Sequence, residues 1–132
     1  MKENEFSELK AIVEKAYAEG TTLEEAERLA AHFLGAQMRV AEELAQIDLD
    51  SRMKKSGLKA IKAAVYMEAV SKADKKPAEG WLENHVALNE LVGEAQTSFD
   101  TADSRKVSLE VYLGIFKDAH IYFRGIAKGR FE

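Results

Sequence analysis

The sequence predicts an all-α protein, a helical bundle that ends in one long C-terminal helix. Three observations support this class. Alanine and glutamate, both good helix formers, are abundant. The chain has a single proline, and apolar residues recur at helical spacing through most of its 132 residues. We expect one domain over residues 1–132, because a chain of this length supports one core and no flexible linker divides it.

Composition places the chain among globular proteins. Hydrophobic residues make up 46% and charged residues 32%, which is too apolar for a disordered chain. The sequence has no cysteine, so it offers no disulfide or thiolate chemistry and no sign of secretion. No stretch has the apolar core of a signal peptide or approaches the roughly 18 apolar residues of a membrane span. We expect a cytoplasmic protein, whether cellular or viral, with no membrane partner.

Acidic helices are expected over residues 1–50. The first runs from Phe6 to about Glu19 and ends at Gly20, a residue typical of helix C-terminal caps. Thr22, followed three residues later by Glu25, forms a capping box. A second helix therefore begins at Leu23.

The second helix carries an amphipathic pattern over Leu23–Leu49. Asp50 or Ser51 could cap a further helix, or the chain could run straight through into the basic segment, residues 52–76. In either case the helical part of that segment extends from about Arg52 to Lys72. The sequence leaves both alternatives open.

A short helix and the long C-terminal helix are expected over residues 77–128. Proline disfavours helix in the residue before it, so Lys76 and Pro77 mark a break. The stretch "PAEGWLENHVAL" then predicts a short helix from Pro77 onward. Asn89 can cap the last helix, which extends from about Glu90 to Lys128 without a proline.

The last helix is apolar over much of its circumference. A heptad seam runs along it, and beyond Leu109 a second apolar stripe lies beside the seam. Such a helix must be covered on two sides, either by another copy of the chain or by a thicker bundle within one chain. We favour self-association into a ring-like homo-oligomer. The predicted interface residues are Leu109, Tyr112, Leu113, Ile115, Phe116, Tyr122 and Phe123.

Sequence signatures of catalysis are missing. The glycines match no phosphate-binding or nucleotide fingerprint. The histidines His32, His85 and His120 fall on different predicted helices, and no Glu-x-x-His pair of the di-iron type occurs. We therefore expect no enzyme, no catalytic residue, no metal site and no cofactor.

Positive charge is concentrated in the middle of an acidic chain. Residues 52–76 contain eight Lys/Arg and two acidic residues, a local charge of +6, whereas residues 1–50 carry −7 and residues 77–132 carry −3. On a helix, the basic residues form a stripe that ends in an aromatic ring, without the alternating glutamates that the chain uses elsewhere. The stripe comprises Arg52, Lys55, Lys59, Lys62 and Tyr66, and Lys54 beside it is also a predicted DNA-binding residue.

Two interpretations of this basic stripe remain open from charge alone. Lysines spaced about one helical turn apart can neutralise successive phosphates, and a tyrosine ring can stack on an unpaired base. That interpretation predicts a site for single-stranded DNA. Alternatively, the stripe is a solvated face that balances nearby acids, among them Glu42, Glu43, Asp48 and Asp50.

The order of features resembles the UvsY-like recombination mediators of phages. "GTTLEEAERLAAHFL" occupies the place of that family's first core helix, and "RMKKSGLKAIKAAVY" resembles its Lys/Arg-Ala motif followed by tyrosine. "KKPAEGWLENHVALNELVGEAQ" resembles the short helix and acidic cap before the long helix. "LEVYLGIFKDAHIYFRGI" resembles the end of that helix. The similarity covers about residues 20–127.

The resemblance implies a non-enzymatic mediator. In the family, the Lys/Arg-Ala segment contacts single-stranded DNA and the last helix builds the oligomer. The protein would hold single strands, help to displace a single-strand-binding protein and assist the loading of a strand-exchange recombinase. A mediator must also touch a protein. The acidic helices offer a surface for the recombinase, or alternatively their glutamates only keep the chain soluble: Glu24, Glu25, Glu27, Glu42 and Glu43.

Two rival functions belong to other classes. A phage structural or assembly protein would use the long helix only to oligomerise and would not bind DNA. A regulator of double-stranded DNA would use "KKSGLKAIKAAVYMEAV" as a recognition helix. That stretch is poor in the Arg, Asn and Gln side chains that recognise base edges, so the regulator ranks lower.

Overall fold

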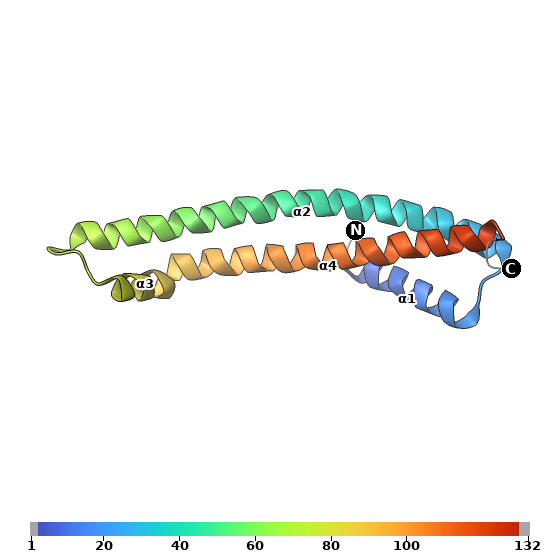
Figure 1. Ribbon diagram of the computed structural model, residues 1–132, viewed down its shortest axis with the longest axis horizontal. Coiled ribbons are helices and arrows are strands. Elements are labelled where there is room, and N and C mark those ends of the chain that lie inside the picture. The colour runs from blue at the N-terminus through green and yellow to red at the C-terminus, as the bar shows by residue number, and fades with distance from the viewer. Residues whose placement is uncertain (1–2, 130–132) are drawn as a thin grey trace. The chain divides into compact units, whose positions relative to one another are not determined.

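The computed structural model describes residues 3–129. Within that range the chain forms four helices and no strand: α1 (Glu3–Glu19), α2 (Leu23–Lys72), α3 (Glu79–Leu88) and α4 (Glu90–Ala127) (Figure 1). The predicted all-α class and the long C-terminal helix are confirmed. None of the four helices over residues 3–129 has both the length and the apolar character needed to cross a bilayer.

The turn between α1 and α2 follows the predicted signals. Gly20 has a φ of 83°, a conformation that side chains other than glycine rarely adopt. Its N–H donates to the carbonyl of Ala16 at 3.0 Å and closes the last turn of α1. The backbone N–H of Glu25 donates to Oγ1 of Thr22 at 3.3 Å. Thr22 therefore caps α2, as the capping box predicted.

Helix α2 runs without interruption through the position where a break was one of two alternatives. Ser51 lies inside the helix and is 5% exposed. A serine side chain is small enough to face the core in a helix as well as to cap one. The chain therefore runs straight from the acidic segment into the basic one.

The short helix begins later than predicted. Pro77 lies outside it, and α3 starts at Glu79 after a residue with extended backbone, φ −59° and ψ 142°. The predicted cap of the next helix is confirmed. Oδ1 of Asn89 accepts hydrogen bonds from the backbone N–H groups of Leu91 at 2.9 Å and Val92 at 3.2 Å, which satisfies two donors in the first turn of α4.

The described residues group into two compact units. Unit 1 contains residues 3–46 and 107–129, that is α1, the first part of α2 and the last part of α4. Unit 2 contains residues 47–106, that is the rest of α2, α3 and the first part of α4. Both boundaries fall inside helices. The expectation of one domain over residues 1–132 stays a prediction.

The core of unit 1 is built from aromatic rings of all three helices. The centroid of the Phe33 ring lies 5.7 Å from those of both Phe116 and Phe123, and the Phe6 ring lies 6.1 Å from Phe116. All four side chains have no exposed surface. Such rings contribute most to the stability of a core because of their large buried area.

The two apolar stripes of α4 in unit 1 are covered within the chain, which was the alternative to self-association that the sequence left open. In unit 1, α1 and α2 supply the cover. Tyr112 packs on Phe6 at 5.2 Å, and Tyr122 packs edge-on against Tyr17 at 4.6 Å. Of the predicted interface residues, Leu109, Phe116 and Phe123 are buried in the single chain, and Tyr112, Leu113, Ile115 and Tyr122 are partly buried. A ring-like homo-oligomer stays a prediction, but these residues no longer require it.

The core of unit 2 is thin. Leu58 and Val65 of α2 pack with Val92 of α4, and partly buried side chains complete the cluster: Ile61, Val86, Ala95 and Phe99. This cluster shows which side of α2 faces the core of unit 2. The basic side chains lie on another part of the circumference of α2 in this unit.

Candidate nucleic-acid interface

The basic side chains of the predicted site lie on α2 within unit 2. The buried residues Leu58 and Val65, seven positions apart, mark the inward direction of the helix. At 100° per residue, Lys55, Lys59 and Lys62 lie on one side of that direction, between about 40° and 100° away from Leu58. The three lysines therefore lie along one side of α2, next to the side that packs into the core of unit 2.

Two members of the predicted set are paired with acids. The guanidinium of Arg52 pairs with Asp48, whose carboxylate also lies 2.9 Å from the ammonium of Lys106. Hydrogen bonds from Lys106 and, next, from Arg52 hold the pKa of Asp48 below its usual range. Lys54 lies 3.0 Å from Asp50. Arg52 and Lys54 thus balance neighbouring acids, as the second interpretation of the basic stripe predicted.

The other three lysines differ from this pair. Among the residues that the structure describes, Lys55, Lys59 and Lys62 have no hydrogen-bond or ion-pair partner, and all three are exposed. We call them the lysine ladder. Their steps of four and three residues correspond to rises of about 6 and 4.5 Å along the helix. Three uncompensated cations in one line attract an extended anionic chain.

The attraction is local rather than general. Unit 2 contains ten Lys/Arg and ten Asp/Glu, so its net charge is zero. Only the segregation of charge onto one flank of α2 favours a polyanion. A site of this kind binds a few phosphates, and its attraction falls away within about one Debye length, roughly 8 Å at physiological salt.

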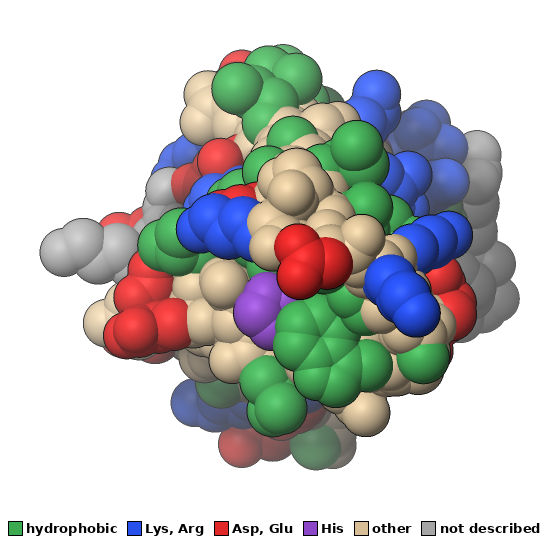
Figure 2. Space-filling model, turned by 90° about the vertical axis from the view of Figure 1, so that its left-hand side faces the viewer, with side chains coloured by type: hydrophobic (Ala, Val, Ile, Leu, Met, Phe, Trp, Pro, Cys, Tyr) green, Lys and Arg blue, Asp and Glu red, His purple; other side chains and the backbone are tan. Residues whose placement is uncertain are grey.

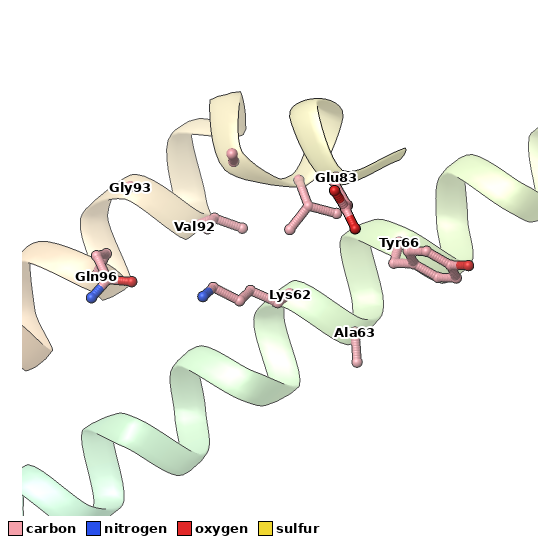
Figure 3. A pocket seen from close by; sticks show the side chains of 9 residues that line it. Lys62, Ala63, Tyr66, Glu83, Val92, Gly93 and Gln96 are labelled. Atoms are coloured by element: carbon pink, nitrogen blue, oxygen red, sulfur yellow. The ribbon is translucent and has the colours of Figure 1, made fainter. Parts of the chain in front are cut away.

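Tyr66 does not project as a free platform. Its hydroxyl donates to Oε2 of Glu79 at 3.2 Å and thereby joins α2 to the start of α3. The ring is partly buried. Figure 3 shows it directed away from the ammonium end of Lys62. The predicted stacking role of Tyr66 stays a prediction, and its ring is held in place by Glu79.

A pocket of about 580 Å³ opens at the end of the lysine ladder. Its walls are mainly apolar and come from three helices of unit 2, with a few polar side chains among them (Figure 3). The lining comprises Lys62, Ala63, Tyr66, Glu83, Val86, Ala87, Val92, Gly93 and Gln96. This volume lies in the range of small-ligand sites.

An aromatic pair that the sequence analysis did not single out lies in the same unit. Trp81 is 53% exposed, and its ring stacks on His85 with centroids 4.9 Å apart and planes inclined by 7°. Both line a second pocket of about 440 Å³ together with Lys72. Figure 2 shows a histidine beside hydrophobic side chains at this end, with Lys/Arg side chains nearby. In the sequence, the signal that could have identified this pair was a histidine four residues after the only tryptophan.

The histidines show no arrangement for metal binding. Nδ1 of His120 donates to the carbonyl of Ala30 at 2.8 Å, and the His32 ring lies edge-on to Phe33. Within residues 3–129, no group of three or more metal-ligating side chains comes together.

Comparison of the chain with models of protein families, with curated protein sequences and with solved structures gives no match. The resemblance to the UvsY-like recombination mediators therefore stays a prediction, carried by the four sequence segments quoted for it.

Proposed function

We propose that the protein binds single-stranded DNA through the lysine ladder of α2 and acts as a recombination mediator. It holds the strand, helps to displace a single-strand-binding protein and assists a strand-exchange recombinase in loading. It does so in the host cytoplasm and without making or breaking a covalent bond. The ladder itself carries the proposal, since its three exposed cations have no partner among residues 3–129.

The composition of α2 favours a phosphate contact over sequence recognition in a duplex. Lysine neutralises a phosphate as a point charge, whereas arginine, asparagine and glutamine recognise base edges with paired hydrogen bonds. Residues 52–66 contain one arginine and neither asparagine nor glutamine. That arginine, Arg52, pairs with Asp48. The side chains left for DNA are therefore of the kind that binds any sequence.

One chain offers only three such charges, so a mediator needs several chains on one strand. Weak sites repeated around an oligomer bind one strand by avidity. A ring-like homo-oligomer would thus compensate for the zero net charge of unit 2. We retain the predicted oligomer for this reason, although the apolar stripes of α4 in unit 1 are covered within the chain.

The role as a mediator also requires a surface for the recombinase. Glu24, Glu25, Glu27 and Glu42 are exposed on the first part of α2, and Glu43 is partly buried there. These acids suit a basic patch on a partner protein. The resemblance to the mediator family supports this assignment, and the charge of the surface agrees with it.

A structural or assembly protein is the second candidate, and an exposed apolar surface favours it. Leu49, Met53 and Met67 are 60%, 65% and 62% exposed. Together with Ala60, these residues are spaced along α2 by four residues and then twice by seven. Met53, Ala60 and Met67 each lie two positions, or about 200°, from a buried residue of α2. We call Leu49, Met53, Ala60 and Met67 the outer apolar side of α2. Apolar side chains facing outward in a row are typical of a surface that binds another chain.

Equilibrium binding distinguishes the two candidates. Fluorescence anisotropy with labelled single-stranded and duplex oligonucleotides, at salt concentrations from about 50 to 200 mM, measures affinity and its salt dependence. The mediator binds single strands more tightly and loses affinity as salt rises. A structural protein shows no salt-dependent affinity for either oligonucleotide, while light scattering still reports an assembly.

A further inference from the structure

We propose that the pocket at the end of the lysine ladder receives a single unstacked nucleobase of the bound strand and favours bases that carry an exocyclic amino group. This inference rests on the proposed binding of single-stranded DNA and adds a base-binding site to it. The inference rests on the position of Lys62, which belongs to the lysine ladder and also lines the pocket.

The walls of the pocket suit a flat, uncharged ring. Ala63 of α2, Val86 and Ala87 of α3 and Val92 of α4 present apolar surface, and Gly93 adds none of its own side chain. Bases of a single strand are not paired and readily leave the stack to lie against protein surface. A phosphate on Lys62 places the base of the same nucleotide at the mouth of this pocket.

Among the polar side chains that line the pocket, the Glu83 carboxylate is the group that only accepts, and it decides which base is favoured. Nε2 of Gln96 donates one of its two N–H groups to Oδ1 of Asp100 at 2.9 Å, which leaves its carbonyl oxygen and the other N–H for a ligand. The Glu83 carboxylate also accepts, and Figure 3 shows it directed from α3 toward α2. Cytosine and adenine offer an amino donor, N4 or N6, whereas thymine presents an oxygen there. The pocket therefore favours cytosine over thymine.

The pocket can be filled without disturbing the helices. A Cβ added at Gly93 meets no atom within 4 Å, and methionine is a better helix former than glycine. Gly93→Met therefore projects into the pocket from α4. Ala63→Met fills it independently from α2, where Ala63 is exposed.

The chain supplies a matched control for each substitution. Gly114→Met adds the same side chain at another open glycine of α4, in unit 1. Ala64→Met alters an exposed residue next to Ala63 that does not line the pocket. A change seen in both filling variants and in neither control arises from the pocket.

The first measurement compares an oligo(dC) strand with the same strand in which abasic sites replace the bases. Both carry the same phosphates, so the salt dependence should be equal. We expect the intact strand to bind the wild-type protein roughly tenfold more tightly, because burial of one base should contribute about as much as one base stack. Gly93→Met and Ala63→Met should reduce that difference, and the two controls should keep it.

The second measurement compares oligo(dC) with oligo(dT), two strands that stack weakly on themselves. The wild-type protein should prefer oligo(dC) by roughly tenfold, the scale of a hydrogen bond to a charged group. Glu83→Ala and Gln96→Ala should each reduce the ratio of the two affinities. The mononucleotide dCMP should compete only at millimolar concentration, because it has one phosphate for the whole ladder.

The outcomes separate this inference from the proposed function. If the protein binds single strands but treats abasic and intact oligo(dC) alike, the nucleobase pocket is wrong and DNA binding stands. If dCMP displaces the oligonucleotide at the oligonucleotide's own concentration, the pocket is a site for free nucleotides and the inference is overturned. If no single strand binds, both proposals fail together.

Discussion

The ammonium of Lys106 on α4 lies 2.9 Å from the carboxylate of Asp48 on α2. The same carboxylate pairs with Arg52. One acid thus joins two helices of unit 2 and also compensates the first cation of the basic stripe. The part of that stripe available to a polyanion therefore begins at Lys55 rather than at Arg52.

This linkage predicts a dependence of stability on pH. Hydrogen bonds from Lys106 and Arg52 lower the pKa of Asp48 below its ordinary value of 3.8. A carboxyl group with a lowered pKa in the folded state stabilises the fold above its unfolded pKa, and this contribution is lost as pH falls through the folded value. Asp48→Asn should lower the melting temperature between pH 5 and pH 7. The difference from wild type should shrink below about pH 4. An equal difference at pH 7 and pH 2.5 would show that the linkage does not stabilise the fold.

The aromatic core of unit 1 predicts a large loss of stability on truncation. Phe116 has no exposed surface and contacts Phe6 and Phe33. Phe116→Ala should lower the free energy of unfolding by about 3–5 kcal/mol, measured by denaturant unfolding. Ile121→Ala, at a half-exposed position of the same helix, should change it by less than about 0.5 kcal/mol. A Phe116→Ala protein of full stability and reduced mass would instead place Phe116 in an interface between chains.

The helix ends and the all-α class were predictable because local chemistry determines them. Gly20, Thr22 and Asn89 act on backbone groups within four residues of themselves. The cover of α4 was not predictable, since an apolar stripe looks the same whether Phe33 of its own chain or a second chain packs on it. Ser51 was ambiguous for a related reason, because one hydroxyl suits a cap or a helix interior.

The candidate site was predictable only in part. Spacing along α2 identified Lys55, Lys59 and Lys62 as one stripe. The alternative that the stripe balances Asp48 and Asp50 holds for Arg52 and Lys54, each four residues after its acid. Spacing did not reveal the second partner of Asp48, a lysine 58 residues away. The pocket could not be predicted from the sequence, because its walls come from three helices that only tertiary packing brings together.

The outer apolar side of α2 predicts where copies of the chain meet. Met53→Glu combined with Met67→Glu should reduce the mass of any assembly, because an interface must then bury two carboxylates without partners. Helix content should stay unchanged, since glutamate is a good helix former. Sedimentation measures both the wild type and the variant. Val107→Glu with Val111→Glu, at half-exposed positions of α4 in unit 1, serves as the control. A wild-type protein that sediments as a monomer at micromolar concentration would contradict the predicted oligomer.

Trp81 gives a direct optical signal, because the chain contains one tryptophan. It is 53% exposed and shares a pocket with Lys72. If the strand continues along unit 2 past the lysine ladder, a base stacks on the indole and quenches its fluorescence. Trp81→Ala should then weaken binding by roughly five- to tenfold with little change in salt dependence. Unchanged fluorescence on saturation with DNA would confine the strand to the ladder.

The most direct test of the account removes the lysine ladder. Lys55→Ala, Lys59→Ala and Lys62→Ala together should leave helicity and mass intact, because all three side chains are exposed. The control removes the same charge from unit 1 through alanine at exposed Lys10, Lys15 and Lys117. Affinity for a labelled single strand is measured for both variants across a salt series.

For single strands, the slope of log affinity against log salt is roughly −0.7 per phosphate neutralised, so loss of three contacts should reduce the slope by about two units. We expect this reduction and a severe loss of affinity in the ladder variant and not in the control. A ladder variant that binds with the affinity and salt slope of the wild type would contradict the account.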